Sequence, residues 1–163
     1  MIRLESVSWD EPRAVAQRAA MDQETGAMYA AFTRGNTPEV NAGIDAALRV
    51  DPATIEYTVI ALDGDEVVGH SALRPFRAPG AEPQLEVKKV FVVPSRRGTG
   101  VAHALLTHLE EDARGRGVAS LVLQTGNLQV DAIALYEKIG YVPIDPFGAY
   151  TAIPGALCFE KQL

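Results

Sequence analysis

Hydrophobic and polar residues alternate with a period of two over several short stretches of this chain, which predicts β-strands. The first is Ile2 to Val7. Two more, Tyr57 to Leu62 and Glu66 to Leu73, are separated by Asp63-Gly64-Asp65, a turn sequence that favours a β-hairpin. Later strands are expected at 85–93, 121–124, 141–144 and 157–162. These stretches predict a sheet of six to seven strands.

Longer segments with a helical period lie between these strands and predict about four helices. In the third of them, four apolar residues fall on one face of the helix. The expected helices are Asp10 to Ala31 with Asp10 as N-cap, Val40 to Val50, Val101 to Gly115, and Asp131 to Ile139 followed by Gly140. Residues 77–83 are rich in Pro, Gly and Ala and are expected to form a loop.

The order of these elements indicates the fold class. Antiparallel hairpins come first, and a β-α-β-α-β segment follows. This order predicts an α+β (mixed α/β) fold, with helices covering a twisted, mostly antiparallel sheet. At 163 residues the chain is expected to form a single domain over residues 1–163.

Composition agrees with an ordinary globular protein, because 47% of the residues are hydrophobic and 22% are charged. No apolar run reaches membrane-spanning length, and Met1 to Glu5 does not resemble a signal peptide. The single cysteine, Cys158, permits no internal disulfide and is expected to be a small core residue. We therefore expect a cytoplasmic protein without a membrane partner.

The formal net charge of −6 argues against nucleic acid as a partner, because such binding depends on neutralising phosphates with Lys and Arg. It weakly favours a cationic or amine-bearing small molecule. A small polyanion remains compatible with the chain where positive charge is local, as at Arg96 and Arg97.

The segment Arg97-Gly98-Thr99-Gly100-Val101-Ala102 follows an expected strand and opens an expected helix. Glycine N–H groups can approach a ligand closely, and a helix N-terminus offers unpaired donors and partial positive charge. The segment therefore predicts an anion site. Arg97 is a candidate ligand residue or a plain surface charge, and Arg96 is the weaker candidate of the two.

Two other phosphate motifs fail on spacing. A dinucleotide fingerprint counted from Gly98 places His103 where a small residue is required. A P-loop needs a Gly-Lys pair, and the chain has none.

Three segments together resemble the GCN5-related N-acetyltransferase (GNAT) superfamily. They are Glu86 to Pro94, Arg97 to Ala102 with its Arg-x-x-Gly-x-Ala pattern, and Ala132 to Tyr141 with Leu-Tyr-Glu-Lys-x-Gly-Tyr. The resemblance covers residues 57–163 and, more weakly, the N-terminal strand and helix. It implies a GNAT-type fold with a V-shaped opening between the two middle strands, one ending near Val93 and the other starting at Leu121.

The resemblance also implies a donor, acetyl-CoA, and direct attack by a primary amine without a covalent enzyme intermediate. It places the pantetheine arm along the backbone of Val92 and Val93, and the pyrophosphate on the N–H groups of Arg97, Gly98, Thr99, Gly100, Val101 and Ala102. The family often has Asn three residues before the alanine of the late helix. Here Gln129 takes that position, with Asn127 two residues earlier, and either can contact the arm.

Tyr136 corresponds to the family tyrosine that hydrogen-bonds the CoA sulfur and can protonate the leaving thiolate. An ordinary phenol, with a pKa of about 10, is a modest acid, yet a hydrogen bond to sulfur stabilises charge without full transfer. The alternative is an aromatic residue packed near Ile133 and Ile139 on the buried face of its helix.

Glu86 lies where relatives carry a glutamate that faces the amine site. Its carboxylate would accept a proton from the ammonium, directly or through water, or orient the substrate. The alternative is a solvated strand residue that pairs with Lys88, two positions along on the same face.

Other residues receive weaker expectations. The chain shows no metal-ligand spacing among His70, His103 and His108, so no metal site is expected, and His103 and His108 are expected to be exposed or partly exposed. Tyr29, Phe32 and Asn36 are candidates for the acceptor wall, with core packing favoured for the two aromatics.

A non-catalytic acyl-CoA-binding or regulatory module on the same fold is the competing hypothesis. Polyamines, aminoglycosides, amino acids and protein N-termini all remain open as acceptors, so the substrate is a small-molecule or peptide amine. The family resemblance also allows a homodimer.

Overall fold

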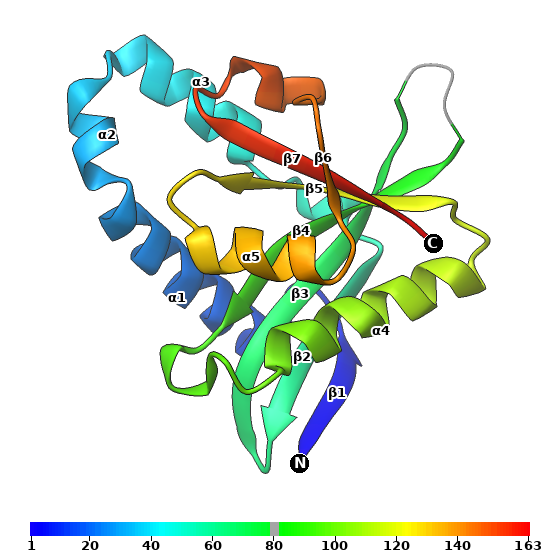
Figure 1. Ribbon diagram of the computed structural model, residues 1–163. Helices are drawn as coiled ribbons and strands as arrows, with labels where there is room; N and C mark the ends of the chain where they lie inside the picture. The colour runs from blue at the N-terminus through cyan, green and yellow to red at the C-terminus, as the bar shows by residue number, and fades with distance from the viewer. Residues whose placement is uncertain (79–81) are drawn as a thin grey trace.

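The computed structural model describes residues 1–78 and 82–163, so the centre of the loop expected at 77–83 lies outside the described residues (Figure 1). The helices and strands alternate broadly as the sequence predicts. In chain order they are β1 (Ile2–Val7), α1 (Pro12–Met28), α2 (Ala30–Gly35), α3 (Pro38–Leu48), β2 (Tyr57–Asp63), β3 (Glu66–Phe76), β4 (Gln84–Val92), α4 (Val101–Gly115), β5 (Ser120–Gly126), α5 (Val130–Lys138), β6 (Val142–Ile144) and β7 (Ala156–Gln162). Short 3₁₀ turns occupy Pro52–Thr54 (η1), Pro94–Arg96 (η2) and Gly148–Ala152 (η3).

One seven-stranded sheet runs in the order β1-β2-β3-β4-β5-β7-β6. Every neighbouring pair is antiparallel except β4 and β5, which are parallel. The hairpin expected at Asp63-Gly64-Asp65 joins β2 and β3, with Gly64 in the left-handed region at φ 62°. The α+β class and the mostly antiparallel sheet are therefore confirmed.

Helices cover both faces of the sheet. The amphipathic helix α4 buries Leu105, Leu106 and Leu109 against one face, and α5 packs beside it (Figure 1). The opposite face carries α1, where Ala14 packs with Ile60 and Leu62 of β2. Because side chains alternate across a strand, β2 supplies both cores with successive residues.

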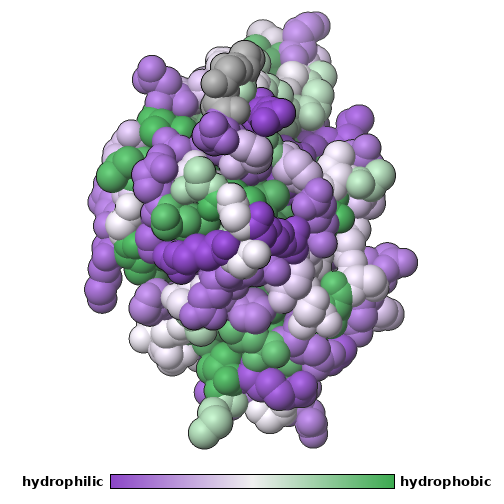
Figure 2. Space-filling model, turned by 90° about the vertical axis from the view of Figure 1, so that its right-hand side faces the viewer, coloured by the Kyte–Doolittle hydropathy of each residue, from purple (hydrophilic) through white to green (hydrophobic). Residues whose placement is uncertain are grey.

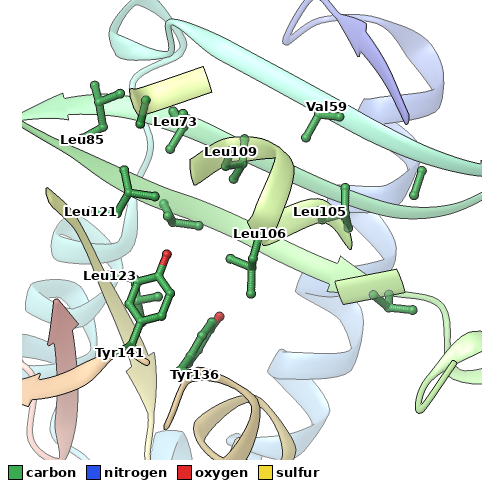
Figure 3. Close-up of a cluster of buried hydrophobic side chains, with 14 of the residues drawn as sticks. Val59, Leu73, Leu85, Leu105, Leu106, Leu109, Leu121, Leu123, Tyr136 and Tyr141 are labelled. Atoms are coloured by element: carbon green, nitrogen blue, oxygen red, sulfur yellow. The ribbon is translucent and has the colours of Figure 1, made fainter. Parts of the chain in front are cut away.

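The main core lies under α4 and α5 (Figure 3). In Figure 3 the rings of Tyr136 and Tyr141 lie next to each other, with Leu106 above Tyr136 and Leu123 beside Tyr141. The ring centroids of the two tyrosines are 5.8 Å apart. Tyr136 from α5 is thus continuous with the leucine core, which limits how its ring can move.

The N-terminal helices differ from the sequence expectation in two ways. Asp10 is not the N-cap, because the carboxylate of Glu11 accepts the N–H groups of Arg13 and Ala14. The expected helix over 10–31 is broken at Tyr29, so the described chain has five α-helices rather than about four. The break follows from a long-range contact, since the Tyr29 hydroxyl accepts the N–H of Leu128 at 3.2 Å.

Figure 2 shows one side of the molecule, where hydrophilic and apolar side chains are intermixed. Within residues 1–78 and 82–163, no helix combines the length and the apolar character needed to cross a bilayer.

Candidate active site

The two parallel strands in the middle of the sheet separate along their length. β4 and β5 pair only at Gln84–Ser120, Leu85–Leu121 and Glu86–Val122. Beyond these pairs β4 continues to Val92 along β3, and β5 continues to Gly126 along β7, but the two strands no longer pair with each other. This is the V-shaped opening that the sequence resemblance implies, and it forms the floor of a cleft of about 1570 Å³. Residues of α1, α2, α3, α5 and the turn before α4 complete its wall.

A β-bulge in β4 accompanies the separation. The pairing of β3 with β4 shifts register between His70 and Ala72, and Lys89 in the bulge has φ 54°. A non-glycine residue in this region is uncommon and costs about 1–2 kcal/mol. Bulges bend a strand and interrupt its ladder, so the bulge turns the end of β4 away from β5.

A buried histidine supports this bulge from β3. The Nδ1 of His70 is 2.9 Å from the carbonyl oxygen of Lys89, and its Nε2 is 3.2 Å from Nη1 of Arg18. Since a guanidinium can only donate, Nε2 accepts and Nδ1 carries the proton. Arg18 is itself held by the carbonyl of Trp9 at 2.6 Å and lies over the Trp9 ring. Burial lowers the pKa of His70 to about 4, and the positive charges of Arg18 and Lys89 act in the same direction.

The glycine turn is built as an anion site. Gly98 and Gly100 have φ 74° and 90°, and a Cβ at either position would meet no heavy atom within 4 Å. The glycines are therefore required for the backbone conformation rather than for close packing. Helix α4 begins at Val101, and its N-cap residue, Gly100, provides no side-chain cap. Among the hydrogen bonds of the described residues, none is donated by the backbone of 98–103. A row of free N–H groups thus faces the cleft at a helix N-terminus.

The arginines next to this turn are already engaged. Arg97 donates from Nε to the carbonyl of Val92 at 3.0 Å and from Nη2 to Glu24 of α1 at 2.7 Å. Arg96 pairs with Asp63 at 2.8 Å, on the hairpin that joins β2 and β3. Arg97 therefore bridges the mouth of the cleft, and an anionic ligand has to compete with Glu24 for it.

The two backbone positions expected beside the pantetheine arm differ. The Val92 carbonyl accepts from Arg97, so this edge of Val92 faces the opening. The N–H of Val93 is bonded to the Val68 carbonyl on β3, and the Val93 carbonyl accepts from Arg96 N. Of the two residues, Val92 offers an edge to the cleft, whereas both backbone groups of Val93 are used within the fold.

The loop after β5 brings Asn127 and Gln129 to the cleft wall. The side chain of Gln129 accepts the N–H of Gly126 at 3.0 Å, so its carbonyl stabilises its own turn. Gly126 also admits Tyr29, because a Cβ there would be 1.8 Å from the Tyr29 hydroxyl. The break between α1 and α2 and the end of β5 are therefore joined across the cleft at one glycine.

Tyr136 is 5% exposed and lines the cleft from the α4 and α5 side. Its ring packs against Tyr141 and Phe159, so the expected aromatic packing is present. Among residues 1–78 and 82–163 its hydroxyl has no hydrogen-bond partner. Burial raises the pKa of Tyr136 above its ordinary value, so the phenol stays protonated and can donate to a ligand atom in the cleft.

Glu86 lies on the face of the sheet opposite Tyr136. The alternative of a solvated strand residue is wrong, because the side chain is buried. Its side chain is 2% exposed and its carboxylate receives Nε of Arg74 at 2.7 Å. The expected pairing with Lys88 is present at 3.4 Å, and the hydroxyl of Tyr150 donates to the same carboxylate. Glu86 is absent from the described lining of the cleft, whereas Lys88 belongs to it.

The remaining expectations divide. Tyr29, Phe32 and Asn36 all line the cleft, but Phe32 is 53% exposed, so core packing is wrong for it. Cys158 is buried as expected. His103 is exposed and His108, partly exposed, lies 2.8 Å from the Tyr57 hydroxyl. In the part of the chain that the structure describes, no three His, Cys, Asp or Glu residues gather as a metal site would require.

Sequence reasoning missed the roles of His70, Arg18 and Tyr150. Arg18 contacts His70 across 52 residues of the chain and Tyr150 contacts Glu86 across 64, whereas His70 contacts Lys89, 19 residues further along. No local pattern marks such residues, and an isolated histidine or tyrosine in a sequence gives no indication of its partner.

Comparison with known proteins identifies the family. The Acetyltransferase (GNAT) family matches residues 15–141, most of the chain and all of the cleft-forming β4, α4 and β5. The chain belongs to this family.

Individual similar proteins are consistent with this family assignment. An IAA acetyltransferase of Azospirillum brasilense is 44% identical over 78 residues, which are 48% of this chain and 51% of that protein. The chain spans about half or less of the length of the curated relatives it first matches. A Klebsiella pneumoniae structure named as an acyl-CoA N-acyltransferase has a TM-score of 0.74 and 27% identity, covering 100% of this chain and 98% of that one. A GNAT acetyltransferase of Elizabethkingia anophelis with acetyl-CoA bound shares the fold, with a TM-score of 0.66 and 18% identity over 99% and 98% of the two chains.

Proposed function

We propose that this protein, as a single GNAT domain over residues 1–163, transfers the acetyl group of acetyl-CoA to a primary amine. The observation that carries the proposal is the joining of two features in one cleft. An unpaired strand edge at β4 leads directly to the uncapped N-terminus of α4. An extended donor with a pyrophosphate needs both, one for an arm that pairs with backbone and one for the phosphates.

The residues present fit such a donor. Free N–H groups over 98–103, including those of Gly98, Thr99, Gly100, Val101 and Ala102, would hold the pyrophosphate. The edge of Val92 would receive the arm, with Asn127 at the opposite wall. Pockets for one drug-sized ligand have volumes of about 300–1,000 Å³, so a cleft of about 1570 Å³ has room for donor and acceptor together. This supports direct attack within a ternary complex.

The chemistry needs little from the protein beyond positioning. The thioester supplies an activated acyl group. The amine nitrogen forms a bond to the acyl carbon, the C–S bond breaks with its electron pair on sulfur, and the amine loses a proton to water. We assign Tyr136 as a hydrogen-bond donor to the leaving sulfur. Full proton transfer from a phenol of raised pKa to a thiolate, whose thiol has a pKa of about 8.5, is uphill, whereas donation is not.

In this proposal Glu86 does not accept the proton of the amine. Its carboxylate is occupied by Arg74, Lys88 and Tyr150 and lies behind the cleft wall. We assign it to orientation, because it fixes the position of Lys88, which does reach the cleft.

The test is release of free CoA from acetyl-CoA with a panel of primary amines, together with CoA binding measured by calorimetry. Binding of CoA with turnover of at least one amine is the expected result. Binding of CoA without acetylation of any amine would instead identify a non-catalytic acyl-CoA-binding module. A cytoplasmic location and a homodimer stay predictions.

A further inference from the structure

A buried charge cluster lies on the face of the sheet opposite Tyr136. One carboxylate, Glu86, is shared by two cations, Arg74 at 2.7 Å and Lys88 at 3.4 Å. The side chains of Glu86 and Lys88 are 2% and 8% exposed. The Tyr150 hydroxyl donates to Glu86 and accepts from Nζ of Lys88 at 2.6 Å and from Arg74 at 3.2 Å. The cluster therefore fixes the ammonium of Lys88 in one position.

This cluster carries one positive charge in excess. Tyr150 and the nearby Cys158 remain uncharged, because burial raises the pKa of both. Pro79, Gly80 and Ala81, which lie outside the described residues, have no ionisable side chain that could supply the missing negative charge. A buried charge without a full partner is costly. In agreement, burial lowers the pKa of Lys88, although Glu86 opposes the shift.

Lys88 is also the member of the cluster that reaches the cleft. It stands two residues beyond Glu86, where β4 and β5 stop pairing, and so at the apex of the opening. Of the acidic residues on the described wall, Asp22 and Glu24 pair with Lys89 and Arg97, and the other two, Asp45 and Asp131, are exposed. Within that wall Lys88 is the one charged residue that is buried.

We propose that the acceptor is an amine that also carries a carboxylate, as an amino acid does, and that Lys88 binds this carboxylate. The inference rests on the proposed acetyl transfer and names its substrate class. A carboxylate on the side of Lys88 that faces the cleft neutralises the cluster and gains a charge-assisted hydrogen bond to a buried ammonium. The amine of the same molecule then lies at the opening, on the side opposite Tyr136. The net charge of −6 attracts cations at long range, but the local charge at the apex has the opposite sign.

The experiment compares amines that differ only in the carboxylate. Each amino acid of a panel, with the amine at the α, β or γ position, is assayed beside its carboxamide and its decarboxylated amine. CoA release gives kcat/KM, and calorimetry with CoA present gives the acceptor Kd. We expect at least one amino acid to exceed both of its partners by tenfold or more in kcat/KM and to bind more tightly.

Variants connect this preference to Lys88. Lys88→Met leaves Glu86 with Arg74 and Tyr150, which is a neutral cluster, so the variant should fold. The variant should lose the preference for the carboxylate, while its Kd for CoA stays within twofold of the original value. Lys88→Arg should restore part of the preference. Lys138→Met, at an exposed lysine of the same cleft wall, is the matched control and should keep the preference.

Two results would overturn the inference, and they are distinguishable. The carboxylate assignment is wrong, and acetyl transfer stands, if carboxamides or simple amines react with the same kcat/KM as the amino acids. The same conclusion follows if the preference for the carboxylate survives in Lys88→Met. If CoA binds and no amine of any class reacts, the proposed function fails together with the inference.

Discussion

His70 donates a hydrogen bond from Nδ1 to the carbonyl oxygen of Lys89, the bulge residue at which β4 turns away from β5. The histidine is fully buried, and Arg18 donates to its other nitrogen. Protonation would place a hydrogen on Nε2 toward a guanidinium. The bulge at the floor of the cleft therefore depends on a neutral histidine.

This dependence predicts how stability varies with pH. The pKa of His70 is about 4 in the folded protein and about 6.5 in an unfolded chain. Between these values the unfolded state binds a proton that the folded state does not, so acidification favours unfolding. The His70 contribution is fully present above about pH 6.5 and is lost as the pH falls toward about 4, by up to about 3 kcal/mol. Urea denaturation at several pH values measures it.

His70→Asn is the comparison, because an amide can donate to Lys89 and does not titrate. Carboxylates contribute to acid sensitivity in both proteins and cancel in the difference. The stability of the variant should change less steeply between pH 4 and 6.5. Equal slopes in the two proteins would show that His70 is not responsible.

Gly126 should tolerate no larger residue. A Cβ there would be 1.8 Å from the Tyr29 hydroxyl and 2.6 Å from its ring, so Gly126→Ala must displace the tyrosine from the cleft wall. We expect a loss of about 1–3 kcal/mol in the free energy of unfolding. Gly43→Ala is the control, since α3 has open space at that position, and it should be neutral or stabilising by up to about 1 kcal/mol. The double variant Tyr29→Ala/Gly126→Ala should recover part of the stability that Gly126→Ala loses, because the clash is gone. No recovery in the double variant would contradict the packing argument.

Gly100→Val tests the anion site. Valine is strongly disfavoured at φ 90°, and the strain of about 1–3 kcal/mol is relieved by moving the turn, which displaces the N–H groups of α4. We expect the Kd for CoA to rise at least tenfold. Gly115→Ala, at the other end of the same helix, has open space and should leave the Kd unchanged. Unaltered CoA affinity in Gly100→Val would exclude this turn as the pyrophosphate site.

Glu24→Gln should strengthen CoA binding. Glu24 holds Arg97 at 2.7 Å, and both side chains are partly exposed, so the pair is worth no more than about 1 kcal/mol. Removing it frees Arg97 for phosphate and should lower the Kd for CoA by up to about fivefold at low salt. Glu66→Gln removes an equal charge outside the cleft wall and controls for the general field. A Kd that stays constant in Glu24→Gln would mean that Arg97 keeps its place when CoA binds.

Much of this architecture follows from local patterns. The hairpin at Asp63-Gly64-Asp65 and the helix over Val101–Gly115 depend on turn chemistry and on one apolar face, and both are found where the sequence places them. The break at Tyr29 could not be predicted, because its partner Gly126 is almost 100 residues away. Burial of Glu86 could not be predicted either, since an acid in an alternating strand indicates a face and not what covers it. Here η3 covers it, through Tyr150.

Tyr136→Phe separates chemistry from binding. Loss of the hydroxyl removes the proposed hydrogen bond to the leaving sulfur, which strengthens as charge develops, so kcat should fall at least tenfold. The ring still packs on Tyr141 and Phe159, so the Kd for CoA should change less than twofold. Single-turnover kinetics with a reactive amine and CoA calorimetry provide the two numbers.

Tyr141→Phe is a matched control for this change. Its ring is 5.8 Å from that of Tyr136, it does not belong to the described wall of the cleft, and its buried hydroxyl lacks a hydrogen-bond partner among the described residues. An unpaired buried hydroxyl is unfavourable, so its removal should leave stability equal or higher and kcat unchanged. If both variants lose kcat equally, the effect of Tyr136 is packing. If neither loses it, the leaving sulfur is stabilised by another group, and Tyr136 belongs to the core alone.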